Sequence, residues 1–139
     1  MRILIAEDDF VSRSFLNKLL SKYGECDIVV DGVETLDAFL MALKENDPYK
    51  LICLDIMMPK ADGVKALKAI RELEEQYEVK EEDRAKIIMI TALAEAQIVQ
   101  TAFEFGCEAY ATKPIDTEKL LEVLEKLRLV KRTEPGNGA

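Results

Sequence analysis

In the stretch LICLDIMMPKADG, residues 51–63, four apolar residues lead directly to Asp55. A short apolar run without polar alternation is typical of a strand that is covered on both faces, as in a parallel sheet. The Met-Met-Pro and Asp-Gly sequences that follow predict a loop. A carboxylate at the end of such a strand is costly to remove from water unless a cation pairs with it. The sequence therefore predicts a partner for Asp55 elsewhere in the chain.

Four more short apolar runs accompany this one and predict four further strands. They cover residues 3–6, 28–30, 87–90 and 109–111. Between the runs lie stretches whose apolar residues repeat at helical spacing. These residues are Val11, Phe15, Leu19 and Leu20; Val33, Leu36, Ala38, Phe39, Leu40 and Leu43; Val64, Leu67, Ala69, Ile70 and Leu73; Ile98, Val99, Ala102, Phe103 and Phe105; and Leu120, Leu121, Val123, Leu124 and Leu127.

Strands that alternate with helices predict an α/β fold, and right-handed crossovers place helices on both faces of one parallel sheet. Five such units commonly form a doubly wound sheet of order 2-1-3-4-5, with a ligand crevice at the carboxyl ends of the strands. The length suits a single domain, which we expect to span residues 1–131. The charged segment 72–86 is expected to extend the third helix and continue as a solvated loop. Residues 132–139 are expected to form a flexible tail.

The composition narrows the possible function classes. The net charge of −8 argues against non-specific nucleic-acid binding and against attraction to anionic membranes. The chain has no histidine, which excludes His-based acid–base catalysis and His metal ligands. Its three cysteines lie far apart in sequence and are expected to be reduced thiols. The apolar N-terminal stretch is too short for a signal peptide or a membrane span, so we expect a cytoplasmic protein.

Polar side chains stand at the predicted carboxyl ends of four strands. They are Glu7 and Asp8 after the first strand, Asp55 at the third, Thr91 at the fourth and Lys113 after the fifth. In a doubly wound fold these ends converge on one edge. Clustered carboxylates repel one another, and a divalent cation such as Mg²⁺, which prefers oxygen ligands, removes that repulsion. With an ammonium and a hydroxyl nearby, the group is equipped to hold a phosphoryl group on or near Asp55, which can act as a nucleophile.

Each of these residues also has a simpler interpretation. Asp8 or Asp9 could cap the first helix, and Asp62 could cap the third. Thr91 could be present for its strand propensity, and Lys113 could be a surface lysine in a turn. Their coincidence at successive strand ends, in the right chain order, favours one shared site.

Four motifs give the chain a wider resemblance. They are ILIAEDD at 3–9, LDIMMPKADG at 54–63, TALA at 91–94 and GCEAYATKPID at 106–116. In these motifs the chain resembles the receiver domains of two-component response regulators, over essentially residues 2–131. That family has the flavodoxin-like version of the doubly wound fold, which agrees with the sheet predicted above.

The resemblance implies a role for each matching acidic-site residue. Asp55 matches the phosphoacceptor aspartate of the family. Asp8 matches the residue that binds Mg²⁺ directly, and Glu7 matches its neighbour, which usually acts through water. Met57 matches the position whose backbone carbonyl is a metal ligand. Asp9 matches no required role.

The resemblance also implies a switch. Thr91 matches the hydroxyl that moves to meet the phosphoryl group, and Tyr110 matches the aromatic residue that then rotates. Lys113 matches the family's lysine at this site, and its bond to Pro114 matches one that is usually cis. An ordinary half-buried tyrosine on an edge strand is the alternative interpretation of Tyr110.

The implied function is that of a signalling switch rather than an enzyme acting on metabolites. A sensor histidine kinase or a histidine phosphotransfer protein would donate the phosphoryl group, and the domain would catalyse its own phosphorylation and dephosphorylation. A downstream protein would bind the face made by the fourth helix, fifth strand and fifth helix, with no direct nucleic-acid or membrane partner. We expect a stand-alone regulator, since the chain begins at Met1. A receiver cut from a larger regulator or hybrid kinase is the alternative.

Three other classes of protein fit the sequence less well. A phosphatase with an aspartate nucleophile usually has a second acid two residues later, where this chain has Met57. A flavodoxin needs a phosphate-binding loop after the first strand, whereas Glu7, Asp8 and Asp9 would repel phosphate. A scaffold receiver that is never phosphorylated is disfavoured by the complete set of site residues.

Overall fold

The computed structural model describes residues 1–60, 62–92 and 95–131. Within them, strands and helices alternate along the chain, as the sequence predicts. In chain order they are β1 (Arg2–Ala6), α1 (Phe10–Leu20), β2 (Glu25–Val29), α2 (Gly32–Lys44), β3 (Leu51–Asp55), α3 (Gly63–Gln76), the 3₁₀ turn η1 (Glu81–Asp83), β4 (Lys86–Thr91), α4 (Ala96–Glu104), β5 (Ala109–Thr112) and α5 (Thr117–Lys126). The predicted flexible tail, residues 132–139, lies outside the described residues.

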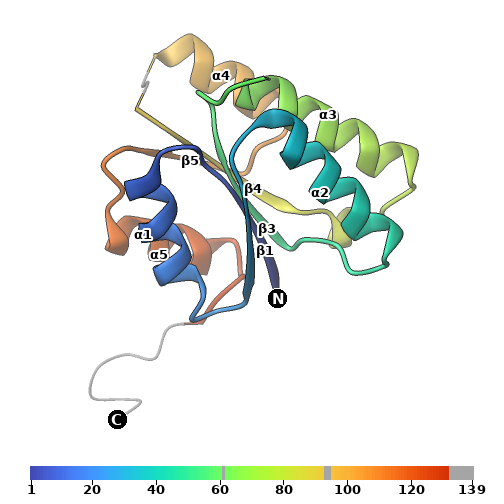
Figure 1. The fold of residues 1–139 in the computed structure, drawn as a ribbon, viewed down its shortest axis with the longest axis horizontal. Helices are drawn as coiled ribbons and strands as arrows, with labels where there is room; N and C mark the ends of the chain where they lie inside the picture. The colour runs from blue at the N-terminus through green and yellow to red at the C-terminus, as the bar shows by residue number, and fades with distance from the viewer. Residues whose placement is uncertain (61, 93–94, 132–139) are drawn as a thin grey trace.

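The five strands form one parallel sheet of order β2-β1-β3-β4-β5, which confirms the predicted topology. Helices α1 and α5 lie on one face of the sheet, and α2, α3 and α4 lie on the other (Figure 1). The fold is therefore the doubly wound, flavodoxin-like α/β fold. Its strand order changes direction between β1 and β3, so the crevice at the carboxyl ends lies beside Asp55.

Strand β3 shows why a continuous apolar run predicts a central strand. All five of its residues are buried. Ile52 and Leu54 pack into the core cluster under α2, α3 and α4, whereas Leu51 and Cys53 pack into the cluster under α1 and α5. Because successive side chains of a strand point to opposite faces, a strand that is covered on both faces has consecutive apolar residues, here residues 51–54.

Aspartates placed just after the strands start four of the helices. They are Asp9, Asp31, Asp62 and Asp116. The side chain of each accepts a hydrogen bond from a backbone N–H three residues later, at distances of 2.8–3.2 Å. Such a cap stabilises a helix by about 1 kcal/mol. The capping interpretation is therefore confirmed for Asp9 and Asp62.

The predicted strand at residues 28–30 is only partly correct. The observed strand, β2, begins at Glu25 and ends at Val29. It lies at one edge of the sheet, where its backbone pairs with β1 from Arg2↔Glu25 to Ala6↔Val29. An edge strand needs little apolar surface, so its polar first half gave no strand signal.

Three helices bury less than the sequence predicts, one of them α2, whose Val33 is 50% exposed. Val11 and Phe15 of α1 are 73% and 37% exposed, and α1 buries Leu16, Leu19 and Leu20 instead. Phe103 of α4 is likewise exposed. The apolar spacing predicts a helix face, but α1 begins at the carboxyl edge of the sheet, where its first turns have little core to cover.

The segment 72–86 is also partly corrected. Helix α3 continues to Gln76 and a mostly exposed loop follows, as predicted. Glu74, however, is buried and forms an ion pair with Arg71 at 2.6 Å. A solvated segment is therefore the wrong prediction for Glu74. Its spacing from Arg71 on one helix was readable from the sequence, but the N–H of Ala85 that donates to its Oε2 at 2.8 Å comes from a distant segment.

Candidate functional site

The carboxyl edge of the sheet gathers the polar residues that follow the strands. Glu7, directly after β1, is 1% exposed, and Asp55, at the end of β3, is 2% exposed. Thr91, the last residue of β4, is fully buried. Asp8 is exposed. Two carboxylates thus lie inside the edge of the sheet and a third lies at its surface.

Lys113 provides the partner that the sequence predicts for Asp55. Its Nζ atom lies 3.1 Å from Asp55 Oδ2 and 2.9 Å from Glu7 Oε1. The backbone N–H of Lys113 donates to the carbonyl of Thr91 at 2.9 Å, which continues the pairing of β5 with β4. The Lys113–Pro114 peptide bond is cis, as expected. Lys113 is therefore not a surface lysine in a turn, since its ammonium lies between two buried carboxylates.

The backbone orients the Asp55 carboxylate from the other side. The N–H of Met57 donates to Asp55 Oδ1 at 3.0 Å, so each carboxylate oxygen of Asp55 has a donor. The N–H of Gly63 donates to the carbonyl of Ile56 at 2.8 Å, which draws the start of α3 against the end of β3. A Cβ atom at Gly63 would lie 2.2 Å from the Asp55 carbonyl oxygen, closer than atoms can approach. Only glycine fits there, whereas the sequence indicated no more than a helix boundary.

Glu7 shows that negative charge exceeds positive charge in this site. Burial, together with the nearby Asp55 carboxylate, raises the pKa of Glu7 to about 7, although Lys113 opposes the shift. Burial alone would lower the pKa of Lys113, but its hydrogen bonds to Glu7 and Asp55 raise it. Glu7 Oε2 is buried and, among the described residues, has no hydrogen-bond partner. A buried oxygen without a donor is costly, so this side of Glu7 favours a proton or a cation.

The three carboxylates could hold a divalent cation. Oxygen atoms of Glu7, Asp8 and Asp55 all lie within 4.8 Å of one another. These oxygen ligands suit Mg²⁺, which often takes one or two carboxylates and keeps several waters. Asp8 is exposed and leaves room for those waters, and Glu7 Oε2 has no hydrogen-bond partner among the described residues. Met57, predicted to contribute its carbonyl, is the next residue but one after Asp55, and its N–H already contacts that carboxylate. Asp9 is committed to its helix cap.

The predicted switch residues lie on neighbouring strands. Tyr110 of β5 stands opposite Met89 of β4, two residues before Thr91. Its half-buried side chain packs against the core cluster under α2, α3 and α4, and burial raises its pKa. Thr91 lies at the site and Tyr110 lies at the sheet edge, so β4 and β5 connect the two. Leu93 and Ala94 of the TALA motif lie outside the described residues.

Two exposed apolar side chains lie near the site; Phe10 had no sequence prediction, and Val11 was predicted to lie on the apolar face of the first helix. Phe10 directly follows the acidic residues and is 69% exposed, and Val11 beside it is 73% exposed. Exposed apolar side chains at the start of a helix could have been suspected only because they adjoin Glu7 and Asp8 in sequence. None of the described helices is long and apolar enough to cross a membrane.

Comparisons with known proteins agree with this geometry. The family model described as response regulator receiver domain matches residues 3–125. The chemotaxis protein CheY of Treponema pallidum (strain Nichols) is 35% identical over 124 residues, which cover 87% of this chain and 78% of that protein. Probable histidine kinase 2 of Oryza sativa subsp. indica is 30% identical over 134 residues, which cover 89% of this chain but only 12% of that protein.

A solved structure gives the same result. The CheX–CheY–BeF3–Mg²⁺ complex from Borrelia burgdorferi contains a chain that is 26% identical, with a TM-score of 0.76. The superposition covers 94% of this chain and 90% of that one. The family match spans most of the chain; it begins at the second residue of β1 and includes the other strands and the residues clustered around Asp55. This chain therefore belongs to the response regulator receiver domains of two-component signalling and is CheY-like.

Proposed function

We propose that this chain is a phosphorylation switch in which Asp55 accepts a phosphoryl group from a phosphohistidine on a partner protein. One observation carries the proposal: a buried aspartate with a donor on each carboxylate oxygen lies between Lys113 and two further carboxylates. A carboxylate used only for structure would not need two other carboxylates within 4.8 Å. The partner would be a sensor histidine kinase or a histidine phosphotransfer protein.

In the proposed reaction an oxygen of Asp55 attacks the phosphorus atom. The phosphorus–nitrogen bond breaks and its electron pair leaves with the imidazole of the partner. Lys113 offers a fixed positive charge to the phosphoryl oxygens, and Thr91 at the end of β4 offers a hydroxyl. Water later hydrolyses the acyl phosphate, which returns the carboxylate and releases inorganic phosphate.

Glu7, Asp8, Asp55 and the carbonyl of Met57 would hold Mg²⁺. When bound, the ion would offset the negative charge of the carboxylates and of the incoming phosphoryl oxygens. The side chains themselves would bind and orient the phosphoryl group. The domain would in this sense catalyse its own phosphorylation and dephosphorylation, but it would act as a switch and not as an enzyme on metabolites.

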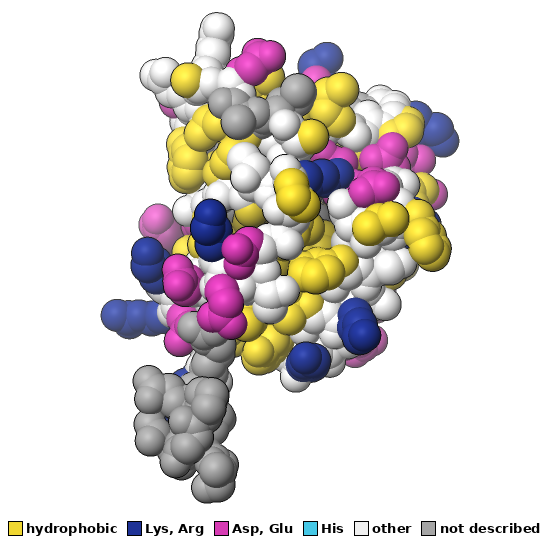
Figure 2. Space-filling view, turned by 90° about the vertical axis from the view of Figure 1, so that its left-hand side faces the viewer, with side chains coloured by type: hydrophobic (Ala, Val, Ile, Leu, Met, Phe, Trp, Pro, Cys, Tyr) yellow, Lys and Arg dark blue, Asp and Glu magenta, His cyan; other side chains and the backbone are white. Residues whose placement is uncertain are grey.

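The surface beside the site supports docking of a protein donor. Figure 2 shows hydrophobic side chains exposed on the side of the molecule that carries α1 and α5. Phe10 and Val11 stand at the start of α1, directly after the acidic residues, and Phe15 follows one turn later. Exposed apolar side chains in such a group are typical of protein contacts. A donor seated on them would bring its phosphohistidine close to Asp55.

A downstream protein would bind the face formed by α4, β5 and α5. Phosphorylation adds negative charge at Asp55, and a shift of Thr91 toward it would free space for Tyr110. The face around Tyr110 would then differ between two states, which a downstream protein could distinguish.

The proposal is tested by intact-protein mass spectrometry after incubation with acetyl phosphate or phosphoramidate. Asp55→Asn removes the nucleophile, and Asp37→Asn, an exposed aspartate of α2, is the matched control. We expect the gain of one phosphoryl group in the unchanged protein and in Asp37→Asn when Mg²⁺ is present. We expect no gain in Asp55→Asn or after chelation.

Two results would contradict the proposal. A gain that persists in Asp55→Asn would place the phosphoryl group on another residue. No gain from either small donor, in a sample that binds Mg²⁺, would contradict self-catalysed phosphorylation and favour a scaffold receiver.

A further inference from the structure

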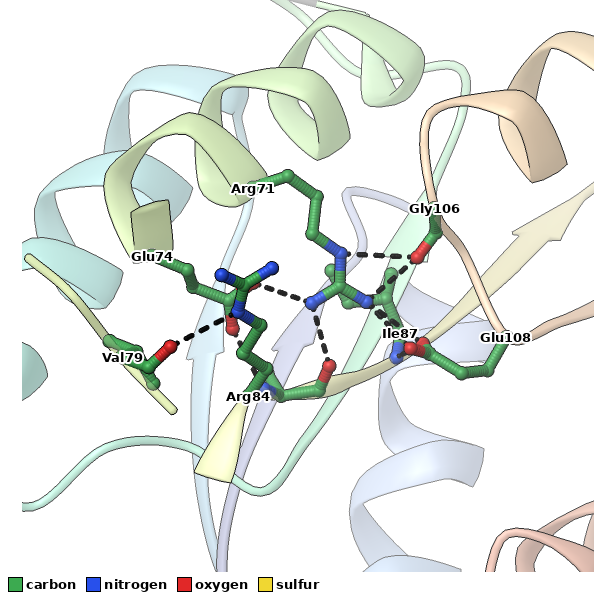
Figure 3. A network of polar contacts seen from close by, with 8 residues as sticks. Arg71, Glu74, Val79, Arg84, Ile87, Gly106 and Glu108 are labelled. Carbon is green, nitrogen blue, oxygen red and sulfur yellow. Dashed lines mark hydrogen bonds and ion pairs between the residues drawn. The ribbon is translucent and has the colours of Figure 1, made fainter. Parts of the chain in front are cut away.

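Arg71 makes an extensive polar network at the edge of the sheet opposite the phosphorylation site (Figure 3). Its Nε and Nη2 atoms donate to the Gly106 carbonyl at 3.1 and 2.8 Å. Nη2 also contacts both carboxylate oxygens of Glu108, at 2.8 and 3.0 Å. Nη1 donates to Glu74 Oε1 at 2.6 Å and to the Ala85 carbonyl at 2.9 Å. One side chain of α3 thus holds the turn that leads into β5.

The same network ties that turn to β4. Glu108 Oε2 accepts from the N–H of Ile87 at 2.6 Å, and the N–H of Glu108 donates to the Ile87 carbonyl at 2.9 Å. Gly106 has a φ of +101°, which L side chains rarely adopt, and a Cβ there would lie 3.3 Å from Arg71 Nε. The turn is therefore shaped so that its carbonyl meets the guanidinium of Arg71.

Strand β5 benefits from such an anchor, because the side chains on one of its faces specify its register weakly. It is a four-residue edge strand, AYAT, and none of its residues, all of them described, is fully buried. Ala109 and Ala111 pack on the same side, against the cluster under α1 and α5. On this face a two-residue slip would exchange one alanine for the other, so packing against this cluster specifies the register only weakly.

A slip would nevertheless destroy the site at the other end of the strand. Each residue of a strand advances the chain by about 3.3 Å. Lys113 follows β5 directly, and its bonds to Glu7 and Asp55 are 2.9 and 3.1 Å long. A shift by a single residue would therefore remove the ammonium from both carboxylates.

We propose that Arg71 is a positioning residue for Lys113. Its hydrogen bonds to Gly106 and Glu108 fix the register of β5 on β4. This register places the Lys113 ammonium within hydrogen-bond distance of Asp55. The inference rests on the proposed function only where phosphorylation of Asp55 is used to read the effect. Arg71 touches neither the phosphoryl group nor the acidic site. It acts through the strand.

The test compares Arg71→Lys, which keeps the charge but loses the fork of donors, with Arg84→Lys as a matched control. Arg84 lies near the same network, but its Nε contacts only the Val79 carbonyl among these residues. The first readout is amide hydrogen exchange over residues 109–113. We expect exchange at least tenfold faster in Arg71→Lys and no more than threefold faster in Arg84→Lys.

The second readout is the rate of phosphorylation by acetyl phosphate with saturating Mg²⁺, in the presence and absence of Lys113→Met. We expect Arg71→Lys to slow phosphorylation at least tenfold when Lys113 is present. In the Lys113→Met background it should change the rate less than twofold, because the residue through which Arg71 acts is gone. Urea unfolding of each variant shows whether it is folded in the assay. If Arg71→Lys does not fold, Glu108→Gln takes its place, since it keeps an acceptor for Ile87 and loses the ion pair with Arg71.

Equal slowing in both backgrounds would overturn the inference, because a general loss of structure affects both alike. So would exchange over residues 109–113 that matches the Arg84→Lys control. If the unchanged protein is not phosphorylated at all, the proposed function fails, and hydrogen exchange alone decides the role of Arg71.

Discussion

Replacing Glu7 by glutamine is expected to make the magnesium-free protein more stable at pH 8 and to change it little at pH 5. Glutamine resembles the protonated form of Glu7 and keeps an oxygen that can accept from Lys113 and from the Asp9 N–H, the two present donors. It removes the charge that burial and Asp55 disfavour. The expected gain therefore follows the titration of Glu7.

The magnitude follows from the pKa of Glu7. It is about 7 in the folded protein, against a usual value of 4.5. Between these values the folded state keeps a proton that the unfolded chain has lost, so the free energy of unfolding falls as the pH rises through this window. Below pH 4.5 both states are protonated and the full contribution is present. At 1.36 kcal/mol for each pH unit, the loss by pH 8 is about 3 kcal/mol.

The assay is urea unfolding from pH 5 to pH 8 in buffer with a chelator. Glu7→Gln should lack the decline shown by the unchanged protein, so that the difference between them grows to about 3 kcal/mol at pH 8. Added Mg²⁺ should stabilise the unchanged protein more than the variant at pH 8. Parallel pH profiles for the two proteins would refute the reasoning, because they would mean that Glu7 does not titrate in this window.

Three further predictions follow from contacts near the site and from the cysteines. Gly63→Ala should destabilise the protein by about 3 kcal/mol in urea unfolding and slow phosphorylation, because its Cβ would overlap the Asp55 carbonyl. Asp9→Ala should cost about 1 kcal/mol in the same assay through loss of the α1 cap, with Mg²⁺ affinity unchanged in titration calorimetry. Cys26, the half-buried thiol, should react first with a thiol reagent under native conditions, as peptide mass mapping can establish. Cys53 should stay unmodified until unfolding, since burial raises its pKa to about 12.

Residue types and spacing were enough to predict the sheet order, because the strands in the middle of the sheet have recognisable apolar runs. Strands β1, β3 and β4 are covered on both faces and have a continuous run of at least four apolar residues each. The start of β2 could not be predicted, because Glu25 is exposed and joins the sheet through backbone pairing with β1. The sequence also did not show how much of each helix face is buried. Periodicity places Val11 on the apolar face of α1, but it does not show that this part of α1 lies at the end of the sheet.

Much of the candidate site could likewise be predicted, because parallel strands bring their carboxyl ends to one edge. Asp55 and Lys113 are 58 residues apart in sequence, yet topology alone brings them into contact. The contribution of Gly63 could not be read from the sequence, since it depends on a close approach between two backbones. Arg71 was missed for a similar reason. Its partners come from α3, from Ala85 just before β4 and from the turn before β5, and no local pattern links these three segments.

One physical reason explains why polar contacts stand at both ends of β5, those of Arg71 before the strand and those of Lys113 after it. A short edge strand with small side chains is easily displaced, but it must place Lys113 within hydrogen-bond distance of two buried carboxylates. Apolar packing could fix it only by burying β5 more deeply, which would also immobilise Tyr110. Charged contacts at the ends leave the middle of the strand half-buried. Arg71 at the start and Lys113 at the end would therefore hold the register without deeper burial of Tyr110, the residue that the proposed switch would move.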